Sequence, residues 1–243
     1  ISGVCSEKGV ALIEDAAHAA GASYKGRPCG TLADAACFSF FSNKNLAVGE
    51  GGMFVSRHED LCRKVELMRS HGMTSGSEER YRSRTLSYDV VTEGLNYRID
   101  EIRSALGLVQ LGKLDSMNAG RSELHLIYLG ELAGVEGLSV PFMEAEEPDA
   151  SSFHIFPVLL DKAADREPFM VALREQGVQT SVHYPAFDEF RAYKSEFPDY
   201  PVLAKDVSGR MVTLPLYPGM RQEEVGLVAA CIRKFFGSRR RAA

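Results

Sequence analysis

Three apolar segments separated by glycine-rich turns dominate the start of the chain. They are Val10 to Ile13, which leads into Glu14-Asp15, then Ala35 to Phe41, and then Met53 to Ser56. Short apolar runs without strict alternation indicate strands that are buried on both faces, as in parallel sheets covered by helices. Helical patterns follow these runs, so we predict an α/β fold.

Two helices are predicted after the third strand. Glu59 to Ser70 has helical spacing, and Ile99 to Met117 is the longest such pattern, with Asp100 as its N-cap. The longer pattern is apolar on several sides, so we expect this helix to be buried on most sides and to extend toward Leu132. The polar stretch Gly72 to Thr92 predicts a long loop.

A change in composition predicts a second domain. Glu144 to Ala150 is acidic and contains Pro148, which is typical of a linker, so we divide the chain into domains 1–143 and 144–243. The second domain has a smaller α+β pattern. Its predicted elements are strands Phe153 to Leu160, Val178 to Val182 and Met211 to Leu214, and helices Arg166 to Gln176 and Glu223 to Phe236.

Charge and composition exclude several classes of protein. Lys and Arg number 28 against 33 Asp and Glu, a formal net charge of −5, so we expect no nucleic-acid partner. No apolar run approaches the roughly 20 residues that span a bilayer. Five cysteines without a CxxC pair and six scattered histidines predict neither a disulfide framework nor a metal site. Free thiols favour a cytoplasmic protein.

The pattern at the start of the sequence leads us to expect an element that begins before its first residue. The sequence starts with Ile1, and Val4 to Gly9 has the pattern of the end of a helix closed by Gly9. We therefore expect the sequence to be part of a longer protein.

Two charged residues stand at positions suited to chemistry. Asp15 ends the first apolar run, where open α/β sheets place ligand-binding groups. A carboxylate there needs a cation or several donors, or it caps the turn at Ala16 to His18. Lys44 follows the second run. Burial would lower the pKa of its amine, as a Schiff-base lysine requires, whereas the common alternative is a surface lysine whose stem covers apolar groups.

Three further features have structural alternatives. Gly49-Glu50-Gly51-Gly52 precedes a strand, whereas phosphate-binding glycine loops follow one, so we expect a tight turn with positive φ. Ser39 interrupts an otherwise apolar strand. Asn96 lies just before the long helix, where alone it would be a turn or capping residue. No single feature decides the function; their order and spacing do.

Ordered motifs extend from about Gly9 to about Phe236. They are Glu14-Asp15-Ala16-Ala17-His18-Ala19, Gly30, Ser39-Phe40-Phe41-Ser42-Asn43-Lys44, Gly49-Glu50-Gly51-Gly52, Arg69-Ser70-His71-Gly72, Gly94-Leu95-Asn96-Tyr97-Arg98 with Ala105, Gly107 and Gln110-Leu111, Ser152-Phe153-His154, Val182-His183-Tyr184-Pro185 and Leu214-Pro215-Leu216-Tyr217-Pro218. Together they resemble the DegT/DnrJ/StrS family of sugar aminotransferases, which depend on pyridoxal 5'-phosphate (PLP) and have fold type I.

The resemblance implies a role for each matching residue. Lys44 would form a Schiff base with PLP and move the proton during catalysis, while Asp15 would pair with the protonated pyridine nitrogen. His18 would lie near the ring and its phenolic oxygen, and Ser39 would donate to the phosphate. Asn96 would reach the phosphate bound by the neighbouring subunit, which implies a homodimer with shared active sites.

His183 and Tyr184 are the candidates for substrate binding. The resemblance places them on the sugar-nucleotide side of the cleft, and the alternative for His183 is a residue packed between domains. His154 is more simply explained by such packing.

The resemblance implies an aminotransferase that moves an amino group, usually from L-glutamate, to a keto sugar, most commonly a nucleotide-linked one. The setting would be polysaccharide or antibiotic biosynthesis. The chain would form the C-terminal half of the PLP-binding large domain, with a mainly parallel sheet, and the small α+β domain; the family's N-terminal part would be missing. Alternatives are a truncated or non-catalytic homologue, a PLP enzyme acting on a cyclitol, and a sugar dehydratase. Dehydratases of the family carry His where this chain has Lys44.

Overall fold

The computed structural model of the protein describes residues 1–74, 87–142, 151–193 and 202–240. Within these ranges the chain forms two compact units, residues 1–116 with 151–152 and residues 117–142 with 153–240. The predicted linker from Glu144 to Ala150 lies outside the described residues. The division into domains 1–143 and 144–243 therefore stays a prediction.

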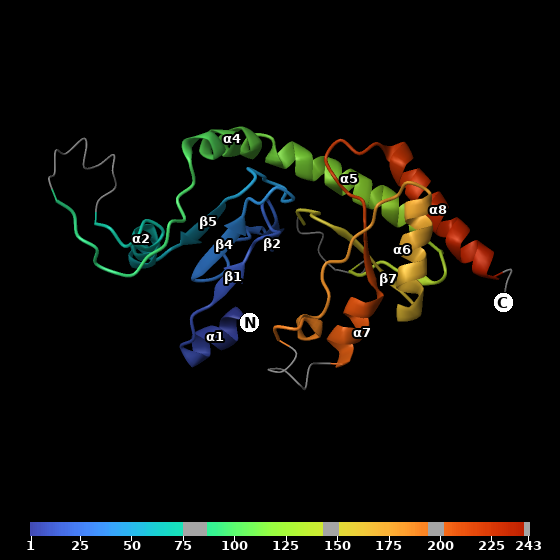
Figure 1. The fold of residues 1–243 in the computed structure, drawn as a ribbon, viewed down its shortest axis with the longest axis horizontal. Helices are drawn as coiled ribbons and strands as arrows, with labels where there is room; N and C mark the ends of the chain where they lie inside the picture. The colour runs from blue at the N-terminus through green and yellow to red at the C-terminus, as the bar shows by residue number, and fades with distance from the viewer. Residues whose placement is uncertain (75–86, 143–150, 194–201, 241–243) are drawn as a thin grey trace. The chain divides into compact units, whose positions relative to one another are not determined.

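The first unit contains a three-stranded sheet with β4 (Ala35–Ser39) in the middle (Figure 1). β1 (Ile13–Asp15) runs parallel to β4, and β5 (Gly52–Ser56) runs antiparallel to it. Ala36 is fully buried in the central strand. β4 and β5 lie at the second and third apolar runs, whereas β1 begins at Ile13, the last residue of the first run. The expectation that the strands are buried on both faces is wrong for β1 and β5 in the described structure, since Ile13 is 64% and Met53 53% exposed. The described sheet is mixed, with one parallel and one antiparallel pairing.

Glu14 in β1 anchors the loop that leads into β4. Its carboxylate accepts backbone N–H groups from Gly30 at 2.8 Å, Leu32 at 2.6 Å and Ala33 at 3.1 Å. Successive side chains of a strand point to opposite faces, so Glu14 and Asp15 serve different purposes. Glu14 thus stabilises the loop, a role that the sequence analysis did not assign.

The glycine turn before β5 contains the expected positive φ at Gly49, where φ is 92°. Gly51 and Gly52 are required for space instead. A Cβ atom on Gly51 would lie 2.9 Å from a methyl group of Val48, and one on Gly52 would lie 2.9 Å from the carbonyl oxygen of Phe38. The turn therefore needs glycine for both conformation and close packing.

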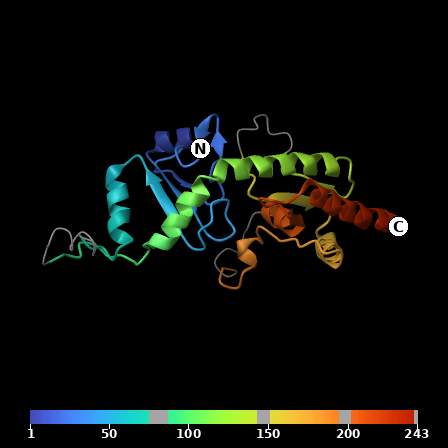
Figure 2. The same ribbon diagram turned by 90° about the horizontal axis from the view of Figure 1, so that it is seen from above.

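The helices at the start of the chain match the expected ends. α1 (Ser2–Lys8) ends at Gly9 in the left-handed conformation, with φ 63°, as the sequence predicts. α2 (Glu59–Met68) packs beside β5 (Figures 1 and 2). A short hairpin of β2 (Ser23–Tyr24) and β3 (Arg27–Pro28) lies between β1 and β4 in the chain.

The predicted long helix is two helices. α4 (Glu101–Leu111) and α5 (Leu114–Leu132) are separated by a tighter turn, where the backbone N–H of Lys113 donates to the carbonyl oxygen of Gln110, three residues back, at 3.1 Å. The predicted N-cap is confirmed, since the Asp100 carboxylate accepts the backbone N–H of Arg103 at 2.8 Å. The expected extension to Leu132 is also confirmed.

The expectation that this helix is buried on most sides is wrong for α4. The described structure buries none of its residues, and Ile102 is 83% exposed and Leu108 73% exposed. An apolar helix face is more stable when it is buried, but it becomes buried only where another part of the structure covers it. The described part of one chain supplies only partial cover for α4.

The second unit contains an antiparallel sheet in the order β6 (Leu138–Ser139), β7 (Phe156–Leu160) and β8 (Met211–Leu214). Alternate residues of β7 are fully buried, which is the period expected of a strand with one face on a core. Its core also includes Tyr128, Phe169, Leu173, Val212, Val225 and Ile232.

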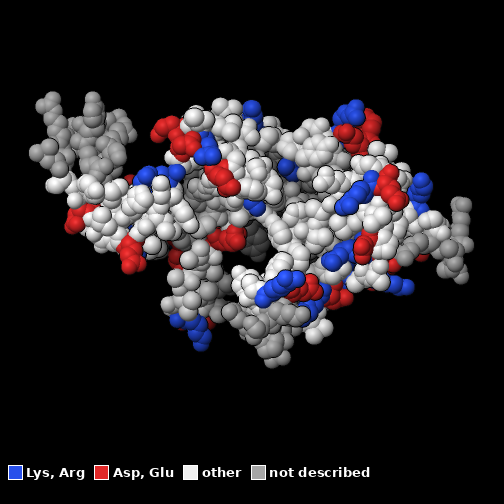
Figure 3. Space-filling model, in the orientation of Figure 1, with Lys and Arg blue, Asp and Glu red and all other residues white. Residues whose placement is uncertain are grey.

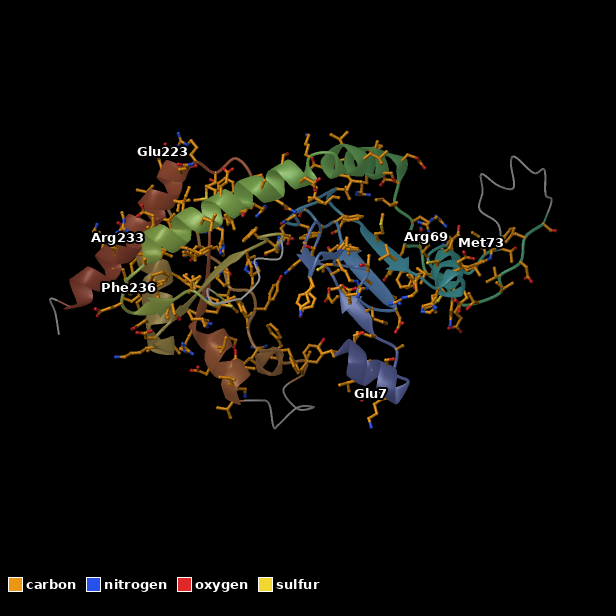
Figure 4. The ribbon with its side chains drawn as sticks, turned by 180° about the vertical axis from the view of Figure 1, so that it is seen from behind. Glu7, Arg69, Met73, Glu223, Arg233 and Phe236 are labelled. Carbon is orange, nitrogen blue, oxygen red and sulfur yellow. The ribbon has the colours of Figure 1, made fainter. Side chains whose placement is uncertain are left out.

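Helices α5, α6 (Arg166–Glu175) and α8 (Gln222–Arg240) contribute to this core. Arg233 of α8, labelled in Figure 4, donates Nη1 to the carbonyl oxygen of Glu131 at 2.8 Å and to its carboxylate at 2.9 Å. This contact joins α8 to α5. The remaining elements are the 3₁₀ turns η1 (Ala163–Asp165) and η2 (Phe187–Glu189) and helix α7 (Val202–Arg210).

Two strand predictions in this unit need correction. The segment Val178 to Val182 forms no strand, because it meets β8 at a single bridge between Ser181 and Thr213 and lacks the successive bonds of a ladder. The strand predicted from Phe153 begins at Phe156, because φ at Phe153 is +46° and cannot continue an extended chain.

Arg121 of α5 is buried in the second unit. Its Nη1 donates to the carbonyl oxygens of Leu216 at 2.9 Å, His154 at 3.3 Å and Phe153 at 3.4 Å. These bonds hold two irregular segments against the helix. Two residues of the motif Ser152-Phe153-His154 are thus held through their backbone carbonyl groups.

The surface carries charges of both signs. Basic and acidic side chains are interspersed over the face drawn in Figure 3. All five cysteines are free. Within the described ranges, no helix combines the length and the apolar character that a membrane span requires.

Candidate active site

Asp15 and Ser39 lie at the carboxyl ends of two adjacent parallel strands. Asp15 of β1 is paired in register with Cys37 of β4, two residues before Ser39. Because parallel strands end at the same edge of a sheet, the loops that follow β1 and β4 meet there. The exposed Asp15 carboxylate accepts the backbone N–H of Ala17 at 3.0 Å, so it caps a turn while remaining accessible.

Lys44 lies in the turn that follows β4. Its backbone N–H donates to the carbonyl oxygen of Phe41 at 2.9 Å, and the residue is half-buried. Burial lowers the pKa of its amine, and the Asp15 carboxylate acts in the opposite direction. The structure therefore brings Lys44 within electrostatic reach of Asp15.

Ser39 and His18 border the same loops. Ser39 is half-buried, and its hydroxyl oxygen accepts the backbone N–H of Phe41 at 3.3 Å. His18 is half-buried in the segment after β1, and its carbonyl oxygen accepts the hydroxyl of Ser152 at 2.6 Å. Asp15 and Ser39 are thus the last residues of β1 and β4, and His18 and Lys44 lie in the loops that follow these strands.

Asn96 is exposed and lies in another part of the first unit. Its backbone pairs with Ser70 in an isolated antiparallel bridge, and no contact described here joins it to Asp15 or Lys44. This placement leaves open the predicted role toward a neighbouring subunit.

His183 and Tyr184 belong to the second unit. His183 is half-buried, and its Nδ1 is 2.9 Å from the hydroxyl oxygen of Thr213. Tyr184 is 55% exposed, and its ring makes an edge contact with that of His183. Their predicted contact with substrate stays a prediction.

Two buried polar residues at the site were missed. Asn45 is 5% exposed and directly follows Lys44; Ser152 is 4% exposed and contacts the Asn45 side chain and the His18 backbone. Ser152 belongs to a motif in the sequence, but no role was assigned to it, because the contacts span more than a hundred residues of chain. For Asn45, the available signal was a polar residue directly after the candidate lysine and directly before the apolar residues Leu46 to Val48.

The described residues fit a phosphorylated aldehyde cofactor better than a metal. They contain no cluster of three or more His, Cys, Asp or Glu side chains that could hold an ion. They do offer an amine of lowered pKa, a carboxylate within its electrostatic reach and a serine hydroxyl in one set of loops. Amine, carboxylate and hydroxyl match the aldehyde, ring nitrogen and phosphate of PLP.

The chain has the α/β fold of PLP-dependent aminotransferases. Residues 1–233 match the DegT/DnrJ/EryC1/StrS aminotransferase family, and the chain belongs to this family. Enzymes of the family depend on PLP. The resemblance predicted from the sequence motifs is therefore confirmed.

Individual relatives agree with this assignment. The chain is 34% identical over 243 residues to the spore coat polysaccharide biosynthesis protein SpsC of Bacillus subtilis, covering 96% of this chain and 61% of SpsC. Among solved structures, it resembles PseC of Helicobacter pylori, an aminotransferase involved in the biosynthesis of pseudoaminic acid, with a TM-score of 0.89, 28% identity, and coverage of 98% of this chain and 62% of PseC.

A second solved structure gives a similar result. The aminotransferase TlmJ from Streptoalloteichus hindustanus matches with a TM-score of 0.87 and 28% identity, over 98% of this chain and 62% of TlmJ. The chain spans 61% of the length of the curated relatives it matches.

Proposed function

We propose that the protein is a PLP-dependent aminotransferase that transfers an amino group from L-glutamate to a keto sugar carried by a nucleotide, with Lys44 as the essential amine. The observation that carries the proposal is that Lys44 follows β4 and Asp15 ends the adjacent parallel strand β1, close enough for the Asp15 carboxylate to influence the pKa of the Lys44 amine. Family membership and the sugar-related roles of SpsC and PseC support the substrate class.

Lys44 would serve as the base and acid of the reaction. Burial keeps a larger fraction of its amine neutral than in water, so Nζ can accept a proton from the substrate carbon and return it. The nearby Asp15 carboxylate limits that shift, so the amine retains enough basicity to accept the proton.

Asp15, Ser39 and His18 would hold the cofactor. The exposed carboxylate of Asp15 is available to a protonated ring nitrogen, and a positively charged ring draws electrons more strongly. The Ser39 hydroxyl would donate to the phosphate, and His18 would lie beside the ring. When bound, PLP supplies the electron sink that stabilises negative charge on the substrate carbon.

We also propose that two copies form a dimer that shares its active sites. The exposed apolar side chains of α4, including Ile102 and Leu108, are a surface suited to a second copy. Asn96 lies just before this helix and is exposed. In such a dimer, Asn96 would act in the partner's site. His183 and Tyr184 would contact the sugar nucleotide, and the enzyme would work in the cytoplasm.

Product analysis of the full-length protein tests the reaction. With L-glutamate and a nucleotide-linked keto sugar, we expect 2-oxoglutarate and an amino sugar in equal amounts, because the amino group leaves one and joins the other. Loss of water from the sugar without 2-oxoglutarate would support a dehydratase instead. Turnover only with a keto cyclitol would favour that substrate class, and no turnover with any keto substrate would favour a non-catalytic homologue.

Mixing two inactive variants tests the shared site. Lys44→Ala and Asn96→Ala dimers, dissociated and reassociated together, should regain up to about a quarter of wild-type activity, because half of random dimers are mixed and each holds one intact site. No recovery with proven subunit exchange would exclude the shared role of Asn96.

A further inference from the structure

A buried polar bridge joins the two loops that carry the candidate catalytic residues. The Asn45 side-chain amide donates to the carbonyl oxygen of Ser152 at 2.6 Å, and the Ser152 hydroxyl donates to the carbonyl oxygen of His18 at 2.6 Å. Asn45 directly follows Lys44, and His18 comes three residues after Asp15. Ser152 thus links both loops from a distant part of the chain.

The direction of each bond in the bridge is fixed. A carbonyl oxygen only accepts, so the Asn45 atom facing Ser152 is the amide nitrogen, and the Ser152 hydroxyl must donate to His18. Asn45 and Ser152 are 5% and 4% exposed, so water cannot readily replace a lost partner. Leaving a buried polar group without a partner costs more free energy than one hydrogen bond contributes to stability. The bridge is therefore favoured over arrangements that leave either of its two bonds unmade.

The bridge holds a part of the chain that lies beyond the strand pairing of the sheet. Pairing with β1 holds β4 up to Cys37, and pairing with β5 holds it up to Ser39, but Lys44 lies five residues beyond the end of β4. Outside the ladder, the turn needs other contacts to hold its position. Backbone bonds from Val48 to Phe40 and from Lys44 to Phe41 close the turn on itself. The bonds from Asn45 to Ser152 and from Ser152 to His18 tie it to the segment after β1.

We propose that Asn45 and Ser152 are positioning residues, which hold the turn that carries Lys44 against the segment that follows Asp15. This inference rests on the proposed function for its catalytic meaning, because it concerns the amine and the carboxylate of that reaction. Neither residue touches the reacting atoms; both act through Lys44. The account predicts that breaking the bridge lets water reach the amine.

Competitive labelling of Lys44 in the cofactor-free, full-length protein tests the proposal. Acetic anhydride reacts with neutral amines, so the labelling of the Lys44 peptide against pH, with the exposed Lys8 as reference, reports how the amine titrates. Burial influences the pKa of the Lys44 amine more strongly than the Asp15 carboxylate does. In Ser152→Ala and in Asn45→Ala, we therefore expect the labelling midpoint to rise by about 0.5 pH unit, which is about a threefold slower reaction at fixed pH.

Two further variants separate positioning from general stability. Ser152→Thr keeps the hydroxyl and should restore the wild-type labelling midpoint. Ser56→Ala is the matched control, because the Ser56 hydroxyl also donates to a backbone carbonyl, that of Asp34, at 2.7 Å, but at the opposite end of the β4–β5 ladder. It should lower the unfolding temperature without moving the Lys44 midpoint.

An unchanged Lys44 midpoint in folded Ser152→Ala and Asn45→Ala would overturn the proposal. In the enzyme with cofactor, the same variants should lower kcat by at least about tenfold while KM changes little, since substrate-binding groups are untouched. If the wild type transfers no amino group, the proposed function fails, but the labelling comparison still decides whether the bridge positions Lys44. If the wild type is active and the midpoint stays fixed, only the positioning proposal fails.

Discussion

Burial lowers the pKa of the Lys44 amine, and the carboxylate of Asp15 opposes part of that shift. The two residues come from different loops, 29 positions apart in the numbering, at one edge of the sheet. Their opposed influences mean that a change to either loop alters how readily the amine gives up its proton. The chemistry proposed for this site depends on that balance.

Neutralising Asp15 should lower the pKa of the Lys44 amine further. In Asp15→Asn, the opposing charge is lost and burial remains, so the pKa of Lys44 should fall further. Competitive labelling of the cofactor-free protein should then show a lower pH midpoint, the reverse of the effect expected for Ser152→Ala. Asp100→Asn is the matched control. It removes the same charge, and asparagine can replace Asp100 as the N-cap of α4.

The variant Asp15→Asn also tests whether Asp15 is needed more for catalysis than for cofactor binding. Asp15→Asn should reduce kcat by a much larger factor than it weakens the affinity for PLP, because the phosphate contacts remain while the ring loses its ionic partner. Cofactor titration followed by absorbance, compared with kcat, measures both. Loss of affinity with unchanged kcat at saturating PLP would contradict the assigned role of Asp15.

Glu14 should be important for stability rather than for chemistry. Its carboxylate accepts three backbone N–H groups, and the amide of Glu14→Gln offers only one oxygen, so at least one N–H loses its acceptor. We expect a loss of about 1–3 kcal/mol in the free energy of unfolding, measured by urea denaturation. Glu66→Gln, on the exposed part of α2, should change the stability by less than about 0.5 kcal/mol. Equal effects of the two changes would contradict the anchoring role of Glu14.

His125 should make the stability of the protein sensitive to acid. Its ring lies among Phe153 and Phe156, its Nδ1 is buried without a hydrogen-bond partner, and burial lowers its pKa below the ordinary 6.5. Below pH 6.5 the unfolded chain binds a proton that the folded state resists, so stability falls as the pH drops from 6.5 toward the folded pKa. Above 6.5 both states are neutral and the effect vanishes.

Urea midpoints at pH 7.5 and pH 5.5 would measure this effect, with both pH values chosen to lie about one unit either side of the ordinary value. His125→Phe should reduce the difference between the two midpoints. His71→Asn is the control, because His71 is exposed and asparagine tolerates its positive φ. A pH difference that is the same in the wild type and in His125→Phe would show that another group causes it.

Local signals predicted several strands and helix ends well. Gly9 and Asp100 act through conformation within a few residues, so the end of α1 and the start of α4 lie near their expected positions. The apolar runs likewise lie at β4 and β5. The motifs around Asp15 and Lys44 also predicted the family, because their order along the chain is specific.

Features that depend on distant contacts were not predictable in the same way. The bridge through Ser152 joins residues 107 and 134 positions away, and no local pattern marks such a contact. The exposure of α4 does not match its apolar composition, because the described residues of one chain cover only part of its surface. Val178 likewise has the residue type of a strand, but a strand needs a ladder that its neighbours do not form.

Covalent trapping is the most direct test of the central claim that Lys44 is the cofactor-bearing amine. The full-length protein with PLP would be reduced with borohydride, digested, and mapped by mass spectrometry. The account predicts the reduced cofactor on the peptide that contains Lys44, and none on that peptide in Lys44→Arg. A label attached mainly to another lysine, or no covalent label on the wild-type protein, would contradict it.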